Sequence, residues 1–447
     1  MIDTKRLLGS AIGLTLALAS PARAELYTLE QAVGYALAHN PQLAAFREQA
    51  RAAGAERRVA EGARLPQLDL NYRVRRSDNP LNAFADKLNT RNVEILDFAP
   101  DNLNEPDPST VHATELLLQV PLYTGGNLTA RVRGASAQAE AARLEASRAQ
   151  QLIRYQTTRA YLAAQSGAEG LAITNDAVRA AQAHANTTAR LVREGRIIVS
   201  DKLSADVNLA AVRAAREKAR TTSRLALHQL RRVMGLRTSA ELALSPWREA
   251  RTAFSPPALA NLEGRALSAR LDLQAMQQRL GAAHAQVDAA RAGHKPNLNV
   301  IASSNWYDED LGTDSHSWSV MGMASINLFA GGRVQQQIKA ERHRAAENED
   351  QLHALRLRIQ NEVQDAHSRW QEARARLKIA SDNVAKARRS VRLINTRYGQ
   401  GRTILLDLLQ AERALVETRN EALSAALDYE TSIMALRLAT GELGDET

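Results

Sequence analysis

The stretch Pro-Leu-Tyr-Thr-Gly-Gly at residues 121–126 has a counterpart, Asn-Leu-Phe-Ala-Gly-Gly, at residues 327–332. The spacing of 206 residues between them holds over a much longer part of the chain, from 120–235 to 326–441. Self-similarity at one fixed spacing is typical of a duplicated structural unit. The positions that coincide under this shift are Gly125-Gly126 with Gly331-Gly332, Gly195-Arg196 with Gly401-Arg402, Asp201 with Asp407, Leu203 with Leu409 and Gly235 with Gly441.

Further upstream the two halves align with a spacing of 230 residues, which places Pro66-Gln67-Leu68 opposite Pro296-Asn297-Leu298. The first half therefore carries an insertion of 24 residues between about 77 and 112. This stretch is polar and contains seven acidic residues against two basic ones, and the loop at 308–315 is acidic as well. We expect both segments to be solvated loops.

Proline placement indicates long helices in both halves. Residues 122–245 and 297–447 contain no proline, the residue that a helix interior excludes. We expect helices over 126–194 and 332–398, each roughly 100 Å long at 1.5 Å per residue. In the second helix, apolar residues follow alternating steps of four and three, which is the heptad pattern of helices packed at shallow angles. They are Ile359, Val363, Ala366, Trp370, Ala373, Leu377, Ala380, Val384, Ala387, Val391, Ile394 and Tyr398.

Four other segments change to a period of two, which predicts β-strands over about 67–76, 113–123, 297–307 and 316–329. A soluble antiparallel sheet with one buried face accounts for any one of them. Their length of about ten to fourteen residues, however, is close to what a tilted transmembrane strand requires. Bulky aromatic residues near the strand ends also favour membrane strands: Tyr72, Tyr123, Trp306, Tyr307, Trp318 and Phe329.

Four membrane strands cannot stand alone, because their open edges leave backbone groups without hydrogen-bond partners in hydrocarbon. Several chains must then contribute strands to one closed barrel. Two chains give eight strands and a nearly filled interior, whereas three give twelve strands and an open lumen. The acidic loops suit the cell-surface end of such a barrel.

The composition limits the remaining function classes. The chain has 447 residues, a net charge of +9, 4% aromatic residues and no cysteine, which excludes disulfides, thiolate metal sites and cysteine nucleophiles. Residues 1–24 read as a secretory signal, with basic Lys5 and Arg6, an apolar core and an Ala-Arg-Ala cleavage site. We therefore expect an exported protein with no nucleic-acid partner. The ten histidines lack metal-ligand spacing, and the fingerprints of nucleophile elbows or phosphate-binding loops are missing. We expect no catalytic residues, no cofactor and no metal.

Together these features resemble the TolC-like outer-membrane efflux proteins. The resemblance covers essentially the whole mature chain. It rests on the tandem halves, on the two Gly-Gly segments, and on Tyr-Gly-Gln-Gly-Arg-Thr-Ile-Leu-Leu-Asp-Leu-Leu-Gln-Ala at 398–411. It implies a mainly α protein with β-strands, in which long helical hairpins form a periplasmic α-barrel. Four strands per chain then contribute to a 12-stranded trimeric β-barrel in the outer membrane of a Gram-negative bacterium. It also implies a homotrimer in contact with outer-membrane lipid, serving as a passive exit duct. A periplasmic adaptor (a membrane fusion protein) would connect that duct to an inner-membrane transporter.

The residues suggest where such a duct bends and docks. Gly125, Gly126, Gly331 and Gly332 lie where a strand must turn into a helix, and Pro66 and Pro296 mark the reverse junctions. We expect adaptor-docking tips at 195–201 and 399–407, with Gly195, Arg196, Gly401 and Arg402 in the turns. The expected division is a signal peptide at 1–24, a first repeat at 25–235, a linking equatorial segment at 236–265, a second repeat at 266–441 and a tail at 442–447.

The charges at the tips have two interpretations. Asp201 and Asp407 can simply cap or begin the returning helices while Arg402 is solvated. Alternatively, the resemblance implies a pore gate in which three Asp407 carboxylates ring the closed bore and Arg402 contacts Asp201 across neighbouring hairpins. The sequence departs from the family pattern in two ways. Gln410 stands where a second acid is expected, and Arg402 lies one place earlier relative to the glycine than the family arginine.

Two other classes of exported protein stay open at this point. A periplasmic adaptor would carry a helical hairpin but not two equivalent halves with amphipathic strand pairs. A coiled-coil structural protein would fit the heptads but not the alternating strands. The sequence does not distinguish an exporter of proteins from an exporter of drugs, metals or small solutes.

Overall fold

The computed structural model describes residues 26–237, 241–247, 254–310, 312 and 315–443, so the expected signal peptide lies outside the described residues. Within these ranges the chain divides into two compact units. The hairpin unit comprises the chain up to Asn40, Ile153–Phe254 and Gln371–Ile433, and the sheet unit comprises the rest. The units cut across the two sequence repeats, because the two helices of 67 residues, Asn127–Arg193 and Arg333–Gly399, are each divided between them.

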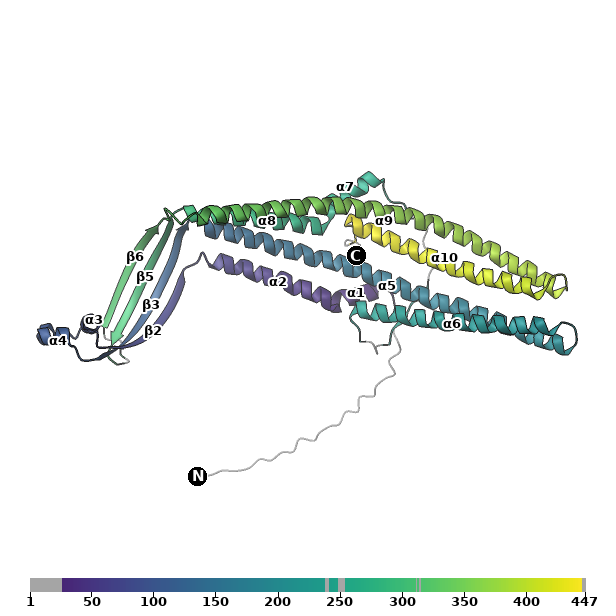
Figure 1. Cartoon of the computed structure of the whole chain (residues 1–447), viewed down its shortest axis with the longest axis horizontal. Coiled ribbons are helices and arrows are strands. Elements are labelled where there is room, and N and C mark those ends of the chain that lie inside the picture. The colour runs from purple at the N-terminus through teal and green to yellow at the C-terminus, as the bar shows by residue number, and fades with distance from the viewer. Residues whose placement is uncertain (1–25, 238–240, 248–253, 311, 313–314, 444–447) are drawn as a thin grey trace, which may run out of the picture. The chain divides into compact units, whose positions relative to one another are not determined.

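The sheet unit contains four antiparallel strands in the order β2-β3-β5-β6 (Figure 1). Their bounds are β2 (Gln67–Ser77), β3 (Ser109–Thr124), β5 (Asn297–Asp308) and β6 (Ser315–Ser325). Pairing of β3 with β5 joins the strand pairs of the two repeats, with a register shift between Pro121 and Tyr123. The fourth strand ends at Ser325, short of the expected 329, because Ser325 is opposite the first residue of β5 and finds no partner beyond it.

The faces of this sheet are open. Along β2 the apolar residues Leu68, Leu70, Tyr72 and Val74 are 52–71% exposed, and Trp318 on β6 is 72% exposed. A soluble sheet would cover such a face with a second layer. In the described part of the chain, β2 and β6 also pair on one side only, which leaves two free edges.

Long helices continue from the sheet and have equal lengths in both repeats. Helices α5 (Asn127–Arg193) and α9 (Arg333–Gly399) each have 67 residues, and their bounds agree with the expected helices to within one residue. The returning helices α6 (Val199–Met234) and α10 (Leu405–Thr440) each have 36 residues. The expected heptad face of α9 is the buried one, since Ile359 and Val363 have no exposed surface. Alanine is abundant at buried helical positions, which explains how the fold manages with few aromatic residues.

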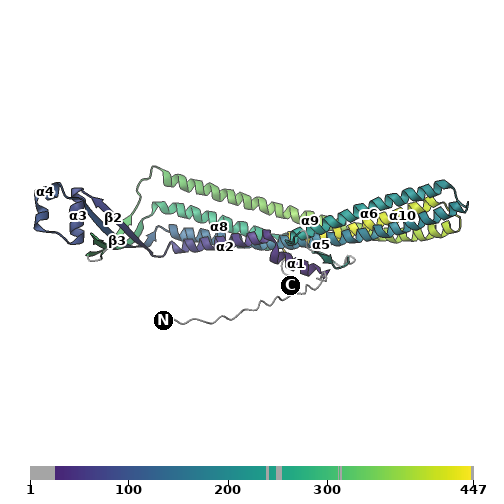
Figure 2. The same ribbon diagram turned by 90° about the horizontal axis from the view of Figure 1, so that it is seen from below.

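Shorter elements complete the two units. The sheet unit holds α2 (Pro41–Gly62), α7 (Leu259–Ala269), α8 (Leu271–Arg291) and η2 (Ala292–His294); the hairpin unit holds α1 (Leu29–His39) and the parallel pair of β1 (Leu26–Tyr27) and β4 (Ala243–Leu244). Figure 2 shows α2, α5 and α8 running alongside one another. None of the helices in the described residues is both long enough and apolar enough to cross a membrane.

The expected loop between β2 and β3 is instead largely helical. It forms α3 (Pro80–Thr90), η1 (Ile95–Phe98) and α4 (Pro100–Asn104). Helix α3 begins here because Pro80 occupies its first turn and the Asn79 side chain accepts hydrogen bonds from the Leu81 and Asn82 amides. The sequence-based expectation of a loop was therefore wrong for much of this segment.

A charged cluster joins four helices within the sheet unit. The Arg270 side chain is only 4% exposed and donates to both oxygens of Asp272, at 3.0 and 2.6 Å, and to Glu362 on α9. Arg148 on α5 donates to the Leu438 carbonyl at the end of α10. Burial opposes ionisation of Asp272, but its hydrogen bonds with Arg270 keep the pKa of this carboxyl below its ordinary value. Both arginines are thus paired or hydrogen-bonded where they are buried.

Two helical hairpins, α5 with α6 and α9 with α10, are joined in the hairpin unit. The apolar part of this contact is the tip cluster, which consists of Ala181, Ala185, Ala205, Leu209, Leu405 and Leu409, with Val212 and Tyr398 packed against it. Two ion pairs also cross between the hairpins: His184 with Glu412 at 2.7 Å and Arg419 with Asp176 at 3.3 Å. The hydrogen bond to Glu412 raises the pKa of His184, although partial burial works against this shift.

This pKa shift predicts a pH-dependent link between the hairpins. Because the folded pKa of His184 is raised, the stabilisation is complete below the unfolded value of about 6.5 and is lost as pH rises through the folded value. The melting temperature of His184→Gln should therefore fall below that of the wild type at about pH 5.5 and match it at about pH 9. Calorimetry of the detergent-purified protein checks this, with His228→Gln, an exposed α6 residue, as the control. A wild-type advantage of the same size at both pH values would contradict the assignment.

Candidate functional site

The junctions between sheet and helices are built from left-handed glycines. Gly125 and Gly126 have φ of +62° and +88°, and Gly331 and Gly332 have φ of +61° and +78°. An L side chain is strained in this conformation, so glycine is required there. At Gly125 the space is also closed, because an added Cβ would lie 2.7 Å from the Lys295 Cβ. These expected hinge residues thus lie directly before α5 and α9.

The two prolines expected at the reverse junctions lie directly before strands. Pro66 precedes β2, and Pro296 precedes β5. In both repeats a helix ends a few residues earlier, at Gly62 in α2 and at His294 in η2. Each repeat therefore enters its strand pair through a proline and leaves it through two glycines.

The two hairpin tips have the same backbone geometry. Gly195 and Gly401 both have φ of +69°, and their amides donate to carbonyls three residues earlier, at 3.0 and 2.9 Å. The following amides, those of Arg196 and Arg402, each donate to a carbonyl five residues earlier at 2.9 Å. This pattern closes a helix end through a left-handed glycine. The duplication detected in the sequence is therefore also a duplication of turn geometry.

The predicted gate carboxylates occupy equivalent helix positions. Asp201 is the third residue of α6 and Asp407 the third residue of α10, and both are partly buried. The residue that caps α6 is Ile198, so Asp201 lies within the first turn and does not cap the helix. A carboxylate in the first turn is stabilised by the helix dipole. Asp407 additionally accepts a hydrogen bond from the Thr403 hydroxyl.

The predicted arginines are exposed. The Arg196 guanidinium lies 3.7 Å from the carboxylate of its neighbour Glu194. Arg402 forms no ion pair with another described residue of the same chain. Its contact with Asp201 across neighbouring hairpins stays a prediction about an assembly of several chains.

Sequence reasoning did not assign a tip function to Tyr398 or Thr403. Tyr398 packs against the tip cluster, and its burial, together with the charge of Asp201, raises its pKa. The sequence offered a partial signal, because Tyr398 ends the heptad pattern of α9. Thr403 had no signal from the duplication, since Ile197 stands at the equivalent position of the first repeat.

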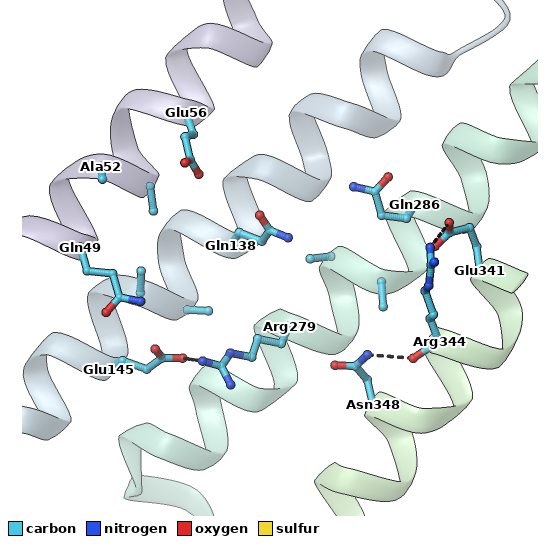
Figure 3. A pocket seen from close by; sticks show the side chains of 15 residues that line it. Gln49, Ala52, Glu56, Gln138, Glu145, Arg279, Gln286, Glu341, Arg344 and Asn348 are labelled. Atoms are coloured by element: carbon cyan, nitrogen blue, oxygen red, sulfur yellow. Dashed lines mark hydrogen bonds and ion pairs between the residues drawn. The ribbon is translucent and has the colours of Figure 1, made fainter. Parts of the chain in front are cut away.

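A hollow of about 670 Å³ lies among α2, α5, α8 and α9 in the sheet unit (Figure 3). Alanines line part of it, and four of the charged side chains around them form two ion pairs. Glu145 lies 2.6 Å from Arg279, and Glu341 lies 2.5 Å from Arg344. Gln49, Glu56, Gln138 and Gln286 add further polar groups. Such a mixture of ion pairs, amides and a further carboxylate suits a hydrated surface.

Comparison with known proteins identifies the wider group. The model of the outer membrane efflux protein family matches residues 32–236 and 262–442. The alkaline protease secretion protein AprF of Pseudomonas aeruginosa is 25% identical over 95% of this chain and 86% of its own length. The outer membrane efflux protein BepC of Brucella suis is 24% identical over 98% of this chain and 91% of its own length.

The fold is shared with solved structures of the same kind. A structure of CusC superimposes with a TM-score of 0.78 at 18% identity, covering 96% of this chain and 95% of the other. The duplicated strand pairs, hairpins and turns therefore occur in a known architecture, and the resemblance inferred from the sequence is confirmed. The chain belongs to the outer membrane efflux protein family.

Proposed function

We propose that this protein is the outer-membrane channel of a tripartite efflux or secretion system, through which substrates pass passively to the outside. The observation that carries the proposal is the four-stranded sheet, which exposes an apolar face and has two free edges in the described chain. Membership of the outer membrane efflux protein family supports the same function. The exposed apolar face of this sheet needs an apolar solvent, and its free edges need further strands as hydrogen-bond partners.

Three copies provide the simplest closed assembly with an open bore. Strands of 11–16 residues are long enough to cross the hydrocarbon layer when tilted. Twelve of them leave a lumen, whereas eight leave an interior that side chains nearly fill. In this arrangement β6 of one copy pairs with β2 of the next. The long helices then continue the passage into the periplasm.

The hairpin tips are the proposed docking end for a periplasmic adaptor, which connects the channel to an energised inner-membrane transporter. Their two identical glycine turns present Arg196 and Arg402 in equivalent, exposed positions. We assign no catalytic step to the channel, so the energy for transport comes from its partners. The alternatives of a periplasmic adaptor or a coiled-coil structural protein do not explain the open sheet or the family match.

Family membership does not determine which substrate this channel transports. By their names, AprF serves secretion of an alkaline protease, whereas other relatives belong to cation and solvent efflux systems. Related channels thus serve cargoes of different chemistry. We infer that the inner-membrane partner of this channel selects its substrate.

Asp407 is the proposed gate residue. Threefold symmetry would bring three Asp407 carboxylates together wherever the tips approach the axis, and a ring of like charges attracts cations and repels anions. Asp201 and Arg402 are the proposed partners that hold neighbouring tips together. If Asp407 serves only the first turn of α10, its charge has no effect on conductance.

A substitution at either tip glycine tests the docking role. Gly195→Val or Gly401→Val should reduce export several-fold, because a side chain at φ of +69° costs roughly 1–2 kcal/mol and changes the turn. The amount of assembled channel should not change, since a Cβ at either position meets no neighbouring atom. Gly399→Val is the matched control, because Gly399 is also unobstructed but lies within α9 without positive φ. Wild-type export and adaptor cross-linking in both tip variants would refute docking at the tips.

Single-channel recordings test the gate. Asp407→Asn should lower the preference for cations over anions, while its amide oxygen can still accept the Thr403 hydrogen bond and preserve the turn. Asp382→Asn on α9, at an exposed position of the described chain, is the control for loss of one carboxylate. Arg402→Ala should raise the conductance of the closed channel if Arg402 holds neighbouring tips. A selectivity ratio that is the same in Asp407→Asn and wild type would leave Asp407 with a role in the helix only.

A further inference from the structure

The segment between β2 and β3, residues 78–108, is here called the helical insert. Several contacts stabilise it. Arg75 of β2 pairs with Asp86, and Lys87 pairs with Asp97 at 2.5 Å. The rings of Phe84 and Phe98 pack edge to face, with 5.5 Å between their centroids. The second repeat has no counterpart of the helical insert, because the short segment 309–314 connects its two strands. The helical insert is therefore a separate structure added to one half of the chain.

Large apolar side chains of the helical insert lie at its surface. Ile95 is 92% exposed, Leu81 is 78% exposed and Leu96 is 70% exposed, and Leu88 and Phe98 are more than half exposed. Single exposed apolar residues are common, but five within 18 residues of an ordered segment are typical of an interaction surface. The folded segment leaves these residues uncovered in the described chain.

The helical insert connects the two free edges of the sheet. It leaves the end of β2, one edge strand, and its α3 helix is fixed to the beginning of β6, the other edge strand. The Ser315 hydroxyl donates to the Thr90 carbonyl at 2.6 Å, and the Arg91 guanidinium donates to the His316 carbonyl at 2.7 Å. Figure 1 shows α3 and α4 at the end of the strands that is farther from α2 and α8. The helical insert thus reaches the edge at which the proposed function places the next copy.

Charge indicates which partner covers the surface. The helical insert carries seven acidic and two basic residues, a composition that opposes immersion in the acyl chains of a membrane. The end of β2 nearest to it carries Arg73, Arg75 and Arg76, of which Arg75 pairs with Asp86 of the same chain. In the closed assembly, β2 of the next copy lies beside β6 and brings its own arginines to the same end. A basic neighbour therefore meets an acidic helical insert.

We propose that the helical insert is a clasp between subunits, in which the exposed apolar residues around Ile95 pack against a second copy of this chain where β6 meets the β2 strand of that copy. This inference rests on the proposed function, because it takes the order of strands around the closed assembly from it. The clasp closes the seam between copies at the end of the sheet, beyond the last strand hydrogen bonds. The helical insert would thus hold neighbouring copies together through side-chain packing, in addition to the hydrogen bonds between the edge strands.

Site-specific photo-cross-linking tests the clasp. A photoreactive phenylalanine analogue placed at Ile95 in the full-length protein should, on illumination in cells, give a covalent species of twice the chain mass on denaturing gels. Mass spectrometry of that species should identify a peptide from residues 67–77 or 78–108 of the second copy, because these lie at the β2 edge of that copy. Adducts with lipid alone, with a different protein, or no adduct at all would overturn the proposal.

A charge variant provides the second measurement. Ile95→Lys combined with Leu96→Lys should lower the temperature at which the purified assembly dissociates, because two charges would be buried in the clasp. Asn89→Lys adds a charge at an exposed polar position of α3 and should leave that temperature unchanged. Native mass spectrometry of the wild type distinguishes a failure of the clasp from a failure of the proposed function. Trimers without an Ile95 cross-link contradict the clasp alone, whereas an absence of trimers contradicts the proposed function.

Discussion

Unpaired backbone groups along the outer edges of β2 and β6 are the constraint on which the rest of the structure depends. A strand edge in water is tolerated when solvent satisfies its amides and carbonyls, but the same edge in hydrocarbon costs several kcal/mol for each unsatisfied group. The exposed apolar face of β2 makes water an unsuitable solvent for this sheet. Closure with strands of other copies satisfies both requirements. In the proposed channel, the free edges of the sheet are therefore the physical reason for assembly of several chains.

The duplication gives both repeats the same backbone course from the strand pair to the hairpin tip. Each repeat enters its strands after a proline and leaves them through two left-handed glycines. Each then runs through a helix of 67 residues to a turn with the same φ of +69°. Because the helical lengths are equal, the two tips of a chain are equivalent in backbone and differ only in side chains. Thr403, which hydrogen-bonds to Asp407, has no polar counterpart in the first repeat. That difference is consistent with distinct roles for the two tips.

Local signals account for the features that the sequence predicted well. The heptad period, together with prolines and glycines near the helix ends, predicted the bounds of α5 and α9 to within one residue. Each of these signals acts on the backbone next to it. The helices of the helical insert were missed because three short helices in a polar stretch carry little periodicity, although Asn79-Pro80 is a helix-start signal. The pairing of His184 with Glu412 could not be predicted from sequence. These residues are 228 positions apart, and only the packing of two hairpins brings them together.

The central claim is that three chains contribute their strands to one channel in the outer membrane. Native mass spectrometry of the protein extracted with detergent from the outer-membrane fraction tests this claim most directly. The account predicts a species with three times the mass of the mature chain. A monomer or dimer as the only extracted form, or recovery of the protein solely from the soluble periplasmic fraction, would contradict it.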